Sequence, residues 1–496
     1  MPEKGLPAGE LPATGVLTVV NAADTRRAGL RHRLRRMLPL LAAVAILQAA
    51  AATGWLYLRS GTGPVAGAGL RARHVTALGA AAVPAAPTPP TTAPPAPPPP
   101  PTPAELRLQS QLAGALAGTP GCVVVGDGAN RAADIQGATP FAPASTQKLL
   151  VAAAALAVLG PDYRFQTTAV AANPPTNGTV SQLWLVGTGD PVLATADYAA
   201  TWVRDRRYAG QPTTPFESLA DQVAAAGVRS VPGGIHGDDS RFVGVRYLPQ
   251  WTPADVASGN ASPLSALDLN QGWQGFTSGY VPAADPPAFA AGQLSRLLAL
   301  RGVAAPPVPA PDAVAPNGTV LATVQSVPLG QIVTAMLRSS DNHTAEMLAL
   351  ELGRRVEGEG STAAGLRAVA QVDQGLGIPT GGLTLVDGSG LSHDDRATCD
   401  TLLGAVDRGT SRPELAAIPL GLPVAGLSGT LVNRWAGTPL QGHLAAKTGS
   451  IGGVAAMAGT LDLGHPIHFA MILNGPGNLT EVEQRAVAAL AAYPGP

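Results

Sequence analysis

The chain has 496 residues and a formal net charge of −1, and only 13% of its residues are charged. This length is enough for two or three domains with a sizeable core. Because the near-neutral charge offers no basic surface, a nucleic-acid partner is not expected. The two cysteines, Cys122 and Cys399, do not form a metal-binding motif, so we expect no metal and no other cofactor. They could form one disulfide outside the cytoplasm or remain two buried thiols, and the sequence leaves both possibilities open.

The N-terminal part has the pattern of a membrane-targeting segment. Arginines crowd residues 26–36, and an apolar run follows over residues 37–58. As a helix this run would rise ~33 Å, slightly more than the ~30 Å hydrocarbon core of a bilayer. The arginines place residues 1–36 in the cytoplasm and the long remainder outside the cell membrane. A cleaved signal peptide, which would make the protein secreted, is the alternative, because small residues at 49–52 offer a cleavage point; we favour a single-pass anchor.

Residues 59–103 are predicted to be a linker between this anchor and the folded part. From Pro84 to Pro103 nearly every residue is proline, alanine or threonine. Such a segment favours the extended polyproline II conformation and would act as a spacer. A spacer suits a protein that works on an extended polymer outside the membrane.

The folded part begins near Ala104 and alternates helical and strand-like segments. Hydrophobic periodicity predicts helices over residues 105–116, 145–159, 330–356 (with an interruption at 339–343) and 480–492. Strands are predicted at 122–125, 183–186, 454–461 and 467–473. These elements indicate an α/β fold with an antiparallel sheet flanked by helices, built from residues 104–163 and 326–496. Residues 164–325 are too long for a loop, so we interpret them as one or more inserted domains.

The first chemical motif is Ser145-Thr146-Gln147-Lys148. Ser145 and Lys148 are three residues apart at a predicted helix start, so both side chains lie on one face. A serine hydroxyl needs a nearby base before it can act as a nucleophile. Lysine can be that base at neutral pH only if its pKa falls by ~3 units, through burial, a nearby cation such as Lys447, or the positive helix N-terminus. The apolar residues that follow Lys148 indicate that this helix is buried.

The second motif, Ser340-Asp341-Asn342, lies between two helical stretches, where a loop can direct side chains into a cleft. The Ser340 hydroxyl can pass a proton between Lys148 and a leaving amine. Asn342 can orient a peptide by hydrogen bonding to its backbone. We expect Asp341 to cap the following helix, which by itself would account for such a residue here.

The third motif is Lys447-Thr448-Gly449-Ser450, at the start of a predicted strand. Gly449 lets a substrate lie against the strand edge because it has no side chain. The Lys447 cation and the hydroxyls of Thr448 and Ser450 can hold a terminal carboxylate. The backbone N–H groups of Ser145 and Ser450 are the expected oxyanion hole, whose donors contribute ~3–4 kcal/mol each.

Together with five further strings, the three motifs resemble the class C low-molecular-mass penicillin-binding proteins, the D-alanyl-D-alanine carboxypeptidase/endopeptidases of peptidase family S13. The further strings are LVGTGDP from Leu185, DDSRF from Asp238, SALDLN from Ser265, DGSGLS from Asp387 and LPVAG from Leu422. The resemblance implies a penicillin-binding-protein/serine β-lactamase-like domain with an insertion after the first motif. It implies that Asp238 helps receive the free amino end of a peptidoglycan stem peptide. His393 and Asp395 stand where relatives usually show Arg and Asn, which puts specificity rather than acylation in doubt.

The activity implied by this resemblance is serine D,D-peptidase action on peptidoglycan stem peptides. Ser145 would be acylated by the penultimate D-alanine, or by a β-lactam antibiotic as a covalent inhibitor, and water would release the acyl group. Two alternatives share the motifs: a serine β-lactamase and a non-catalytic penicillin-sensing or wall-binding protein. The lifetime of the acyl-enzyme separates the first from a peptidase, and release of D-alanine from a pentapeptide separates the second.

Overall fold

The computed structural model describes residues 100–203 and 205–495. The predictions for residues 1–36 and 37–58, and most of the linker predicted at 59–103, lie outside the described residues. Among the helices of the described part, none is long and apolar enough to cross a bilayer. All elements below belong to the compact unit Ala96–Pro496.

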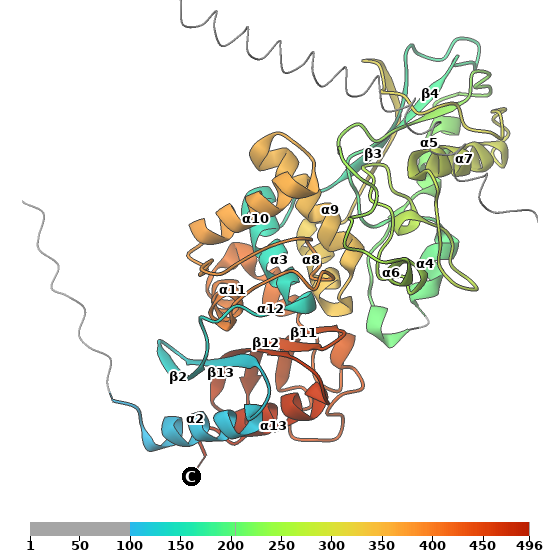
Figure 1. Cartoon of the computed structure of the whole chain (residues 1–496). Coiled ribbons are helices and arrows are strands. Elements are labelled where there is room, and N and C mark those ends of the chain that lie inside the picture. Colours follow the sequence, from blue (N-terminus) through green and yellow to red (C-terminus); the bar gives the residue numbers. More distant parts are fainter. Residues whose placement is uncertain (1–99, 204, 496) are drawn as a thin grey trace, which may run out of the picture. The chain divides into compact units, whose positions relative to one another are not determined.

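A five-stranded sheet lies at the centre of the part formed by the two ends of the described chain (Figure 1). Its strands are β1 (Gly121–Asp127), β2 (Asn130–Ile135), β11 (Leu444–Ile451), β12 (Val454–Asp462) and β13 (Pro466–Asn474). The strand order is β11-β12-β13-β1-β2, and every neighbouring pair is antiparallel. The predicted strands at 122–125, 454–461 and 467–473 are therefore confirmed as β1, β12 and β13. Strand β11, which contains the third motif, is an edge strand.

Helices cover both faces of this sheet (Figure 1). Helices α2 (Pro103–Leu116) and α13 (Leu479–Ala491) cover one face, and the other is covered by a layer of α3 (Lys148–Leu159), α8 (Leu329–Ser339), α9 (Asn342–Leu352), α10 (Thr362–Gly375) and α11 (Cys399–Ser411). Strand β1 shows how the sequence produces these two cores. Val123 and Val125 pack with α2 and α13, whereas Cys122 and Val124 pack with α3. This alternation follows from the two-residue repeat of a strand.

The predicted helices are confirmed in place, with one correction. The capping box of Thr102 and Glu105 begins α2, and the interruption in the 330–356 stretch is the break between α8 and α9. The helix predicted from residue 145 is a short 3₁₀ turn, η1 (Ala144–Gln147), and α3 begins at Lys148. Ala144 has a φ of +46°, so the chain turns sharply before the regular helix can begin.

Residues between α3 and α8 form a second sheet of four strands, with the order β10-β3-β4-β7. Its strands are β3 (Gln166–Ala171), β4 (Leu183–Gly187), β7 (Ile235–Asp238) and β10 (Thr319–Gln325). The pair β4–β7 is parallel and the others are antiparallel. Helices α5 (Glu217–Ala225) and α7 (Pro286–Ala299) pack on this sheet with a core of their own (Figure 1). The predicted strand at 183–186 is β4.

Smaller elements of this inserted region lie between its sheet and the five-stranded sheet's helix layer. They are β5 (Leu193–Ala194), α4 (Ala196–Trp202), η2 (Arg206–Tyr208), β6 (Thr214–Pro215), α6 (Pro253–Ala257), β8 (Trp273–Gly275) and β9 (Val281–Pro282). Through η2 and the loops around α6 and β8 this region contacts the segment of the second motif. The inserted region is therefore in a position to influence the site.

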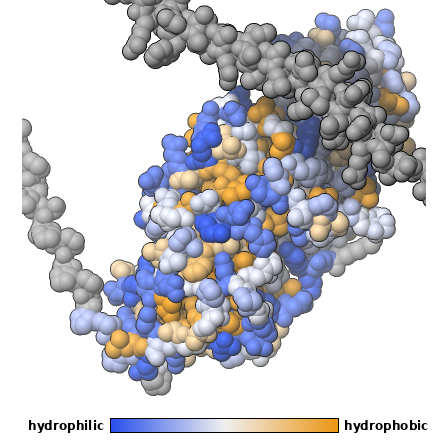
Figure 2. Space-filling view, in the orientation of Figure 1, coloured by the Kyte–Doolittle hydropathy of each residue, from blue (hydrophilic) through white to orange (hydrophobic). Residues whose placement is uncertain are grey.

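The surface of the described part is mixed in character. Figure 2 shows hydrophilic residues over much of the face in view, with hydrophobic patches between them. Exposed apolar side chains such as Val203, Val308 and Val314 are scattered over the inserted region. Scattered exposure of this kind is ordinary for soluble domains, so it does not indicate a binding surface.

Cys122 and Cys399 form a disulfide, which settles the alternative that the sequence left open. It joins the second residue of β1 to the first residue of α11, across a separation of 277 residues. Both cysteines are fully buried in the core between the sheet and the helix layer. The crosslink therefore ties the first strand of the sheet to the helix layer that carries Lys148.

Candidate active site

Ser145 and Lys148 are brought together by the tight turn at the start of α3. The Lys148 Nζ donates a hydrogen bond to the Ser145 Oγ at 2.9 Å. The same ammonium donates to the Asn342 Oδ1 at 2.7 Å and to the Ser389 carbonyl oxygen at 2.6 Å. The sequence therefore predicts the serine–lysine pair correctly, and the structure adds the backbone of the DGSGLS string as a third contact of the lysine.

The DGSGLS string is a compact loop because Asp387 organises its backbone. The Asp387 carboxylate accepts hydrogen bonds from the backbone N–H groups of all four residues from Ser389 to Ser392. Gly390 has a φ of +75°, and a Cβ atom there would lie 2.0 Å from the Ala144 carbonyl oxygen. Only glycine allows this loop to press against the turn that carries Ser145. The loop thereby presents the Ser389 carbonyl oxygen to Lys148.

Two further carboxyl groups support this loop from inside the protein. Glu346 accepts hydrogen bonds from the N–H groups of Gly388 and Ser389, at 2.9 and 2.7 Å. Asp395 accepts one from the N–H of Val386 at 2.7 Å. Burial raises the pKa of Glu346 and of Asp395 to about 8, and the Asp387 carboxylate adds to both increases. Burial in this region therefore disfavours the charged form of both groups.

Lys148 has the electrostatic surroundings of a base that works near neutral pH. Burial lowers its pKa to about 8, although the carboxylates of Asp387, Glu346 and Asp341 act in the opposite direction. The Arg207 cation helps to lower this pKa, and the repulsion between Lys148 and Lys447 that the sequence suggested is seen in the lowered pKa of Lys447. About one tenth of the molecules then hold a neutral lysine at pH 7. A neutral Nζ at 2.9 Å from a hydroxyl can accept its proton.

The second motif forms the break between α8 and α9, and its residues contact both buried lysines. Ser340 adopts the left-handed conformation, with φ 65° and ψ 42°, and its Oγ accepts a hydrogen bond from the Lys447 Nζ at 2.8 Å. Asp341 caps α9 by accepting from the Thr344 N–H, as the sequence predicts. The Asn342 amide contacts Lys148 through its oxygen and donates to the Asn260 carbonyl oxygen at 2.8 Å. In this structure Asn342 thus supports Lys148, and its contact with substrate stays a prediction.

Lys447 lies beneath the site and not on its surface. Its side chain is fully buried, and besides Ser340 its Nζ donates to the Thr448 carbonyl oxygen at 2.6 Å. Burial lowers its pKa well below the usual lysine value, and the charges of Lys148 and Arg207 act in the same direction. Besides Lys4, these two lysines are the only ones in the sequence. Both lysines of the described part are therefore buried at this one site.

Strand β11 passes directly beside the nucleophile turn. A Cβ atom on Gly449 would lie 2.7 Å from the Pro143 carbonyl oxygen and 3.1 Å from the Ser145 nitrogen, so this position requires glycine. The Thr448 hydroxyl lies 2.7 Å from the hydroxyl of Thr430. β11 is the edge strand of the sheet, and residues 423–425 pair only with its beginning, at residues 444–446. The outer side of the part that carries the third motif can therefore pair with an extended peptide.

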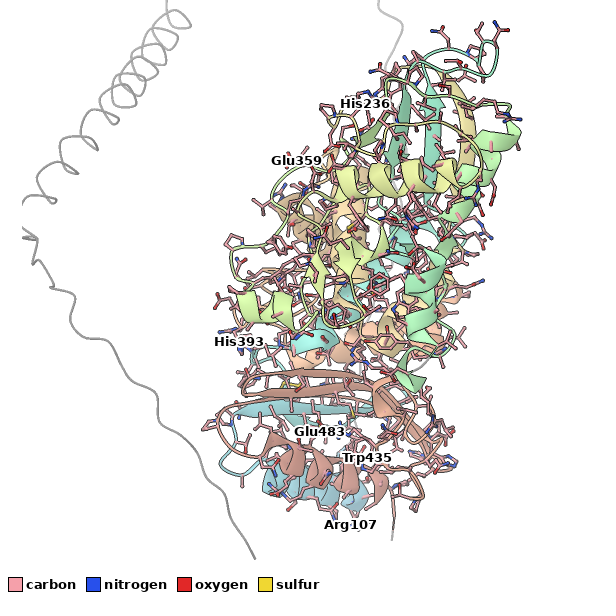
Figure 3. All side chains as sticks on the ribbon, turned by 90° about the vertical axis from the view of Figure 1, so that its right-hand side faces the viewer. Arg107, His236, Glu359, His393, Trp435 and Glu483 are labelled. Carbon is pink, nitrogen blue, oxygen red and sulfur yellow. A yellow bond between two sulfur atoms is a disulfide. The ribbon has the colours of Figure 1, made fainter. Side chains whose placement is uncertain are left out.

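An open cavity of about 1010 Å³ contains the exposed parts of the three motifs. The predicted site residues that line it are Ser145, Ser340, Asn342, Thr448, Gly449 and Ser450. His393 is also on its wall, and Figure 3 labels this residue above the five-stranded sheet. The structure therefore brings the three motifs together around one cavity, with the two lysines under its floor.

Asp238 is not among the residues that line this cavity. It ends β7 in the inserted sheet and lines a different cavity of about 460 Å³. Its two carboxylate oxygens accept hydrogen bonds from the N–H groups of Ser240 and Ala315. In Figure 3, His236 on the same strand lies far from His393 at the active-site cavity. Asp238 therefore orders its own loops, and its role in receiving a substrate amine stays a prediction.

Sequence reasoning missed several residues of the cavity wall. Asp205 and Arg207 come from η2 and its N-cap, Asn260 from the loop after α6, and Thr430 from the segment before β11. None of them belongs to a short motif with the catalytic residues, because each lies far from them in sequence. Among the described residues no cluster of histidine, cysteine, aspartate and glutamate is arranged to hold a metal ion.

The fold and the site are those of the penicillin-recognising serine enzymes, with a buried lysine hydrogen-bonded to a serine that lines the cavity. The chain is 38% identical over 371 residues to carboxypeptidase DacB of Mycolicibacterium smegmatis, covering 72% of this chain and 76% of the relative. It is 31% identical over 440 residues to a D-alanyl-D-alanine carboxypeptidase of Actinomadura, covering 72% and 78%. The crystal structure of penicillin binding protein 4 from Haemophilus influenzae has the same fold, with a TM-score of 0.64 at 22% identity over 77% of this chain and 98% of that one.

The family model described as "D-Ala-D-Ala carboxypeptidase 3 (S13) family" matches residues 106–284 and 277–493. The chain therefore belongs to this peptidase family, as its motifs indicated, and it is a serine D,D-peptidase with the α/β fold of penicillin-binding proteins.

Proposed function

We propose that the enzyme cleaves the bond between the two terminal D-alanines of peptidoglycan stem peptides through an acyl-enzyme on Ser145. The observation that carries this proposal is the 2.9 Å hydrogen bond between Ser145 and a fully buried Lys148. Lys148 takes the hydroxyl proton while the Ser145 Oγ forms a bond to the carbonyl carbon. The C–N bond to the last residue then breaks, and the leaving amine gains a proton.

The other motifs have roles that fit their positions. The Ser340 hydroxyl accepts a hydrogen bond from Lys447. It gives its hydrogen to the leaving amine and regains one from Lys148, which holds the proton taken from Ser145. The hydroxyls of Thr448 and Ser450 line the cavity and can hold the terminal carboxylate, with the buried charge of Lys447 behind them. The stem peptide lies along the free edge of β11 as an added strand. A β-lactam enters the same reaction, but its acyl group is released slowly.

The open cavity leaves room for a larger leaving group, so we propose that cross-linked peptides are cleaved as well. Purified protein is expected to release D-alanine from monomeric pentapeptide muropeptides and to separate cross-linked dimers, with products identified by mass spectrometry. The Ser145→Ala variant is the control and is expected to give neither product. Cleavage that survives Ser145→Ala would contradict the proposal, and a protein that only binds penicillin, without products, would be a sensor.

We also propose that the peptidase domain lies outside the cytoplasmic membrane, tethered by the apolar run at residues 37–58. The arginine-rich segment before that run supports this orientation, and the Cys122–Cys399 disulfide supports an oxidising compartment. Both cysteines are expected to be oxidised in the producing cells. Alkylation of free thiols in intact cells before lysis, followed by mass spectrometry, tests this, and alkylated Cys122 and Cys399 would contradict it.

A further inference from the structure

Arg207 is a charged side chain of the inserted region that lines the catalytic site. It lies on η2 and lines the active-site cavity together with Ser145. Its Nε and Nη2 both donate hydrogen bonds to the Ser339 carbonyl oxygen, at 2.9 and 2.6 Å. Ser339 is the last residue of α8 and directly precedes Ser340. A residue from 132 positions earlier in the chain thus fixes the peptide unit that leads into the second motif.

The conformation of Ser340 requires such support. A residue with a side chain is destabilised in the left-handed region, and it stays there only when its surroundings fix it. The inserted region contacts the motif on both sides of Ser340. Arg207 holds the preceding carbonyl group, and Gln271 donates to the Asp341 carboxylate at 2.6 Å. Together these contacts hold the Ser340 hydroxyl where Lys447 can reach it.

Arg207 is also a positive charge without a carboxylate partner among the described residues. The ion pairs found there involve other arginines and histidines. The nearby Asp205 uses its carboxylate to accept the Arg207 backbone N–H, at 2.8 Å. The guanidinium lies over the Tyr208 ring, with its carbon 5.5 Å from the ring centre. Its charge therefore acts on the cavity and is not neutralised by an ion pair.

The charges around Lys148 show what the guanidinium changes. Burial lowers the pKa of Lys148, the carboxylates of Asp387, Glu346 and Asp341 raise it, and Arg207 lowers it again. The Lys447 ammonium lies close enough for Lys148 and Arg207 to depress its pKa in turn. Without the positive charge of Arg207, the carboxylates would raise the pKa of Lys148 further. Lys148 would then stay protonated up to a higher pH.

We propose that Arg207 is a positioning residue for acylation, which holds the turn before Ser340 and supplies the positive charge that keeps Lys148 available as a base. This inference rests on the proposed function of Ser145 and Lys148. It also gives the inserted region a direct part in the reaction, although it contributes no reacting atom. The two effects of Arg207 are separable. An uncharged hydrogen-bond donor at this position can hold the turn before Ser340, but it cannot supply the positive charge that acts on Lys148.

Three variants separate the charge from the hydrogen bond. Arg207→Gln can keep a donor but loses the charge, Arg207→Lys keeps the charge with one donor, and Arg206→Gln removes the exposed neighbouring arginine as a control. The rate of acylation by a fluorescent penicillin is measured from pH 5 to 9, after circular dichroism has shown that each variant is folded. Arg207→Gln is expected to move the acidic limb of the profile to higher pH by ~0.5–1 and to slow acylation at pH 7 by about tenfold.

Arg207→Lys is expected to keep the wild-type limb with a loss of only a few-fold, and Arg206→Gln to behave as wild type. If Arg207→Gln keeps both the limb and the rate, or if both Arg207 variants slow acylation with an unchanged limb, the proposed charge effect is wrong. Should Arg207→Gln fail to fold, an altered limb in Arg207→Lys would also overturn it. Failure of the proposed function is distinct, because the wild-type protein would then release no D-alanine from a pentapeptide, whatever its rate of acylation by penicillin.

Discussion

Replacement of Lys148 by methionine is expected to slow acylation of the protein by penicillin by about 10³-fold at pH 7. Lys148 is the one basic group that contacts the Ser145 hydroxyl among the described residues, and a general base contributes about 10²–10⁴ to such a step. Methionine has a similar length and fills the same buried space. The rate is measured from the increase of protein-bound fluorescence with a labelled penicillin.

Lys148→Arg is the matched control for this prediction. Arginine keeps the positive charge next to Asp387 and Glu346, but it stays protonated at any pH that proteins tolerate. If Lys148 acts as a base, Lys148→Arg loses activity about as far as Lys148→Met, while thermal melting shows a folded protein. If Lys148 only anchors the DGSGLS loop, Lys148→Arg retains much of the rate, and the account of Lys148 is wrong.

Most of the regular structure of the peptidase part could be predicted from the sequence, because each element carries a strong local signal. The apolar runs of β1, β12 and β13 predict strands, and the capping residue Asp341 marks a helix start. The start of α3 was placed too early, since the positive φ of Ala144 is imposed by its packing against Gly390. That contact joins segments far apart in the chain and leaves no local pattern.

The three motifs predict which residues lie together at the site, but not which of them form hydrogen bonds with one another. Ser145 bonds to Lys148 as expected, whereas Ser340 bonds to Lys447 and Lys148 bonds to Asn342. These pairings depend on the left-handed turn at Ser340, which is fixed by contacts from the inserted region. Residue types and spacing do not encode such contacts.

The inserted region is where sequence reasoning was weakest. Asp238 was chosen because its string resembles one in the family, yet it caps loops of the inserted sheet. Asp205 and Arg207, which do line the cavity, stand in an unremarkable polar stretch. Without knowledge of how η2 packs, nothing in their local sequence distinguishes them from solvent-exposed residues. A site formed between distant segments is found only when the fold is known.

The most direct test of the central claim is to identify the residue that penicillin acylates. The protein is incubated with penicillin G, digested, and its peptides are analysed by tandem mass spectrometry. We expect one penicilloyl group per molecule, on Ser145, and complete loss of the adduct in Ser145→Ala, because in the described part only this hydroxyl accepts a hydrogen bond from Lys148. A stable adduct on Ser340, Ser450 or any other residue, or an adduct that persists in Ser145→Ala, would contradict this account.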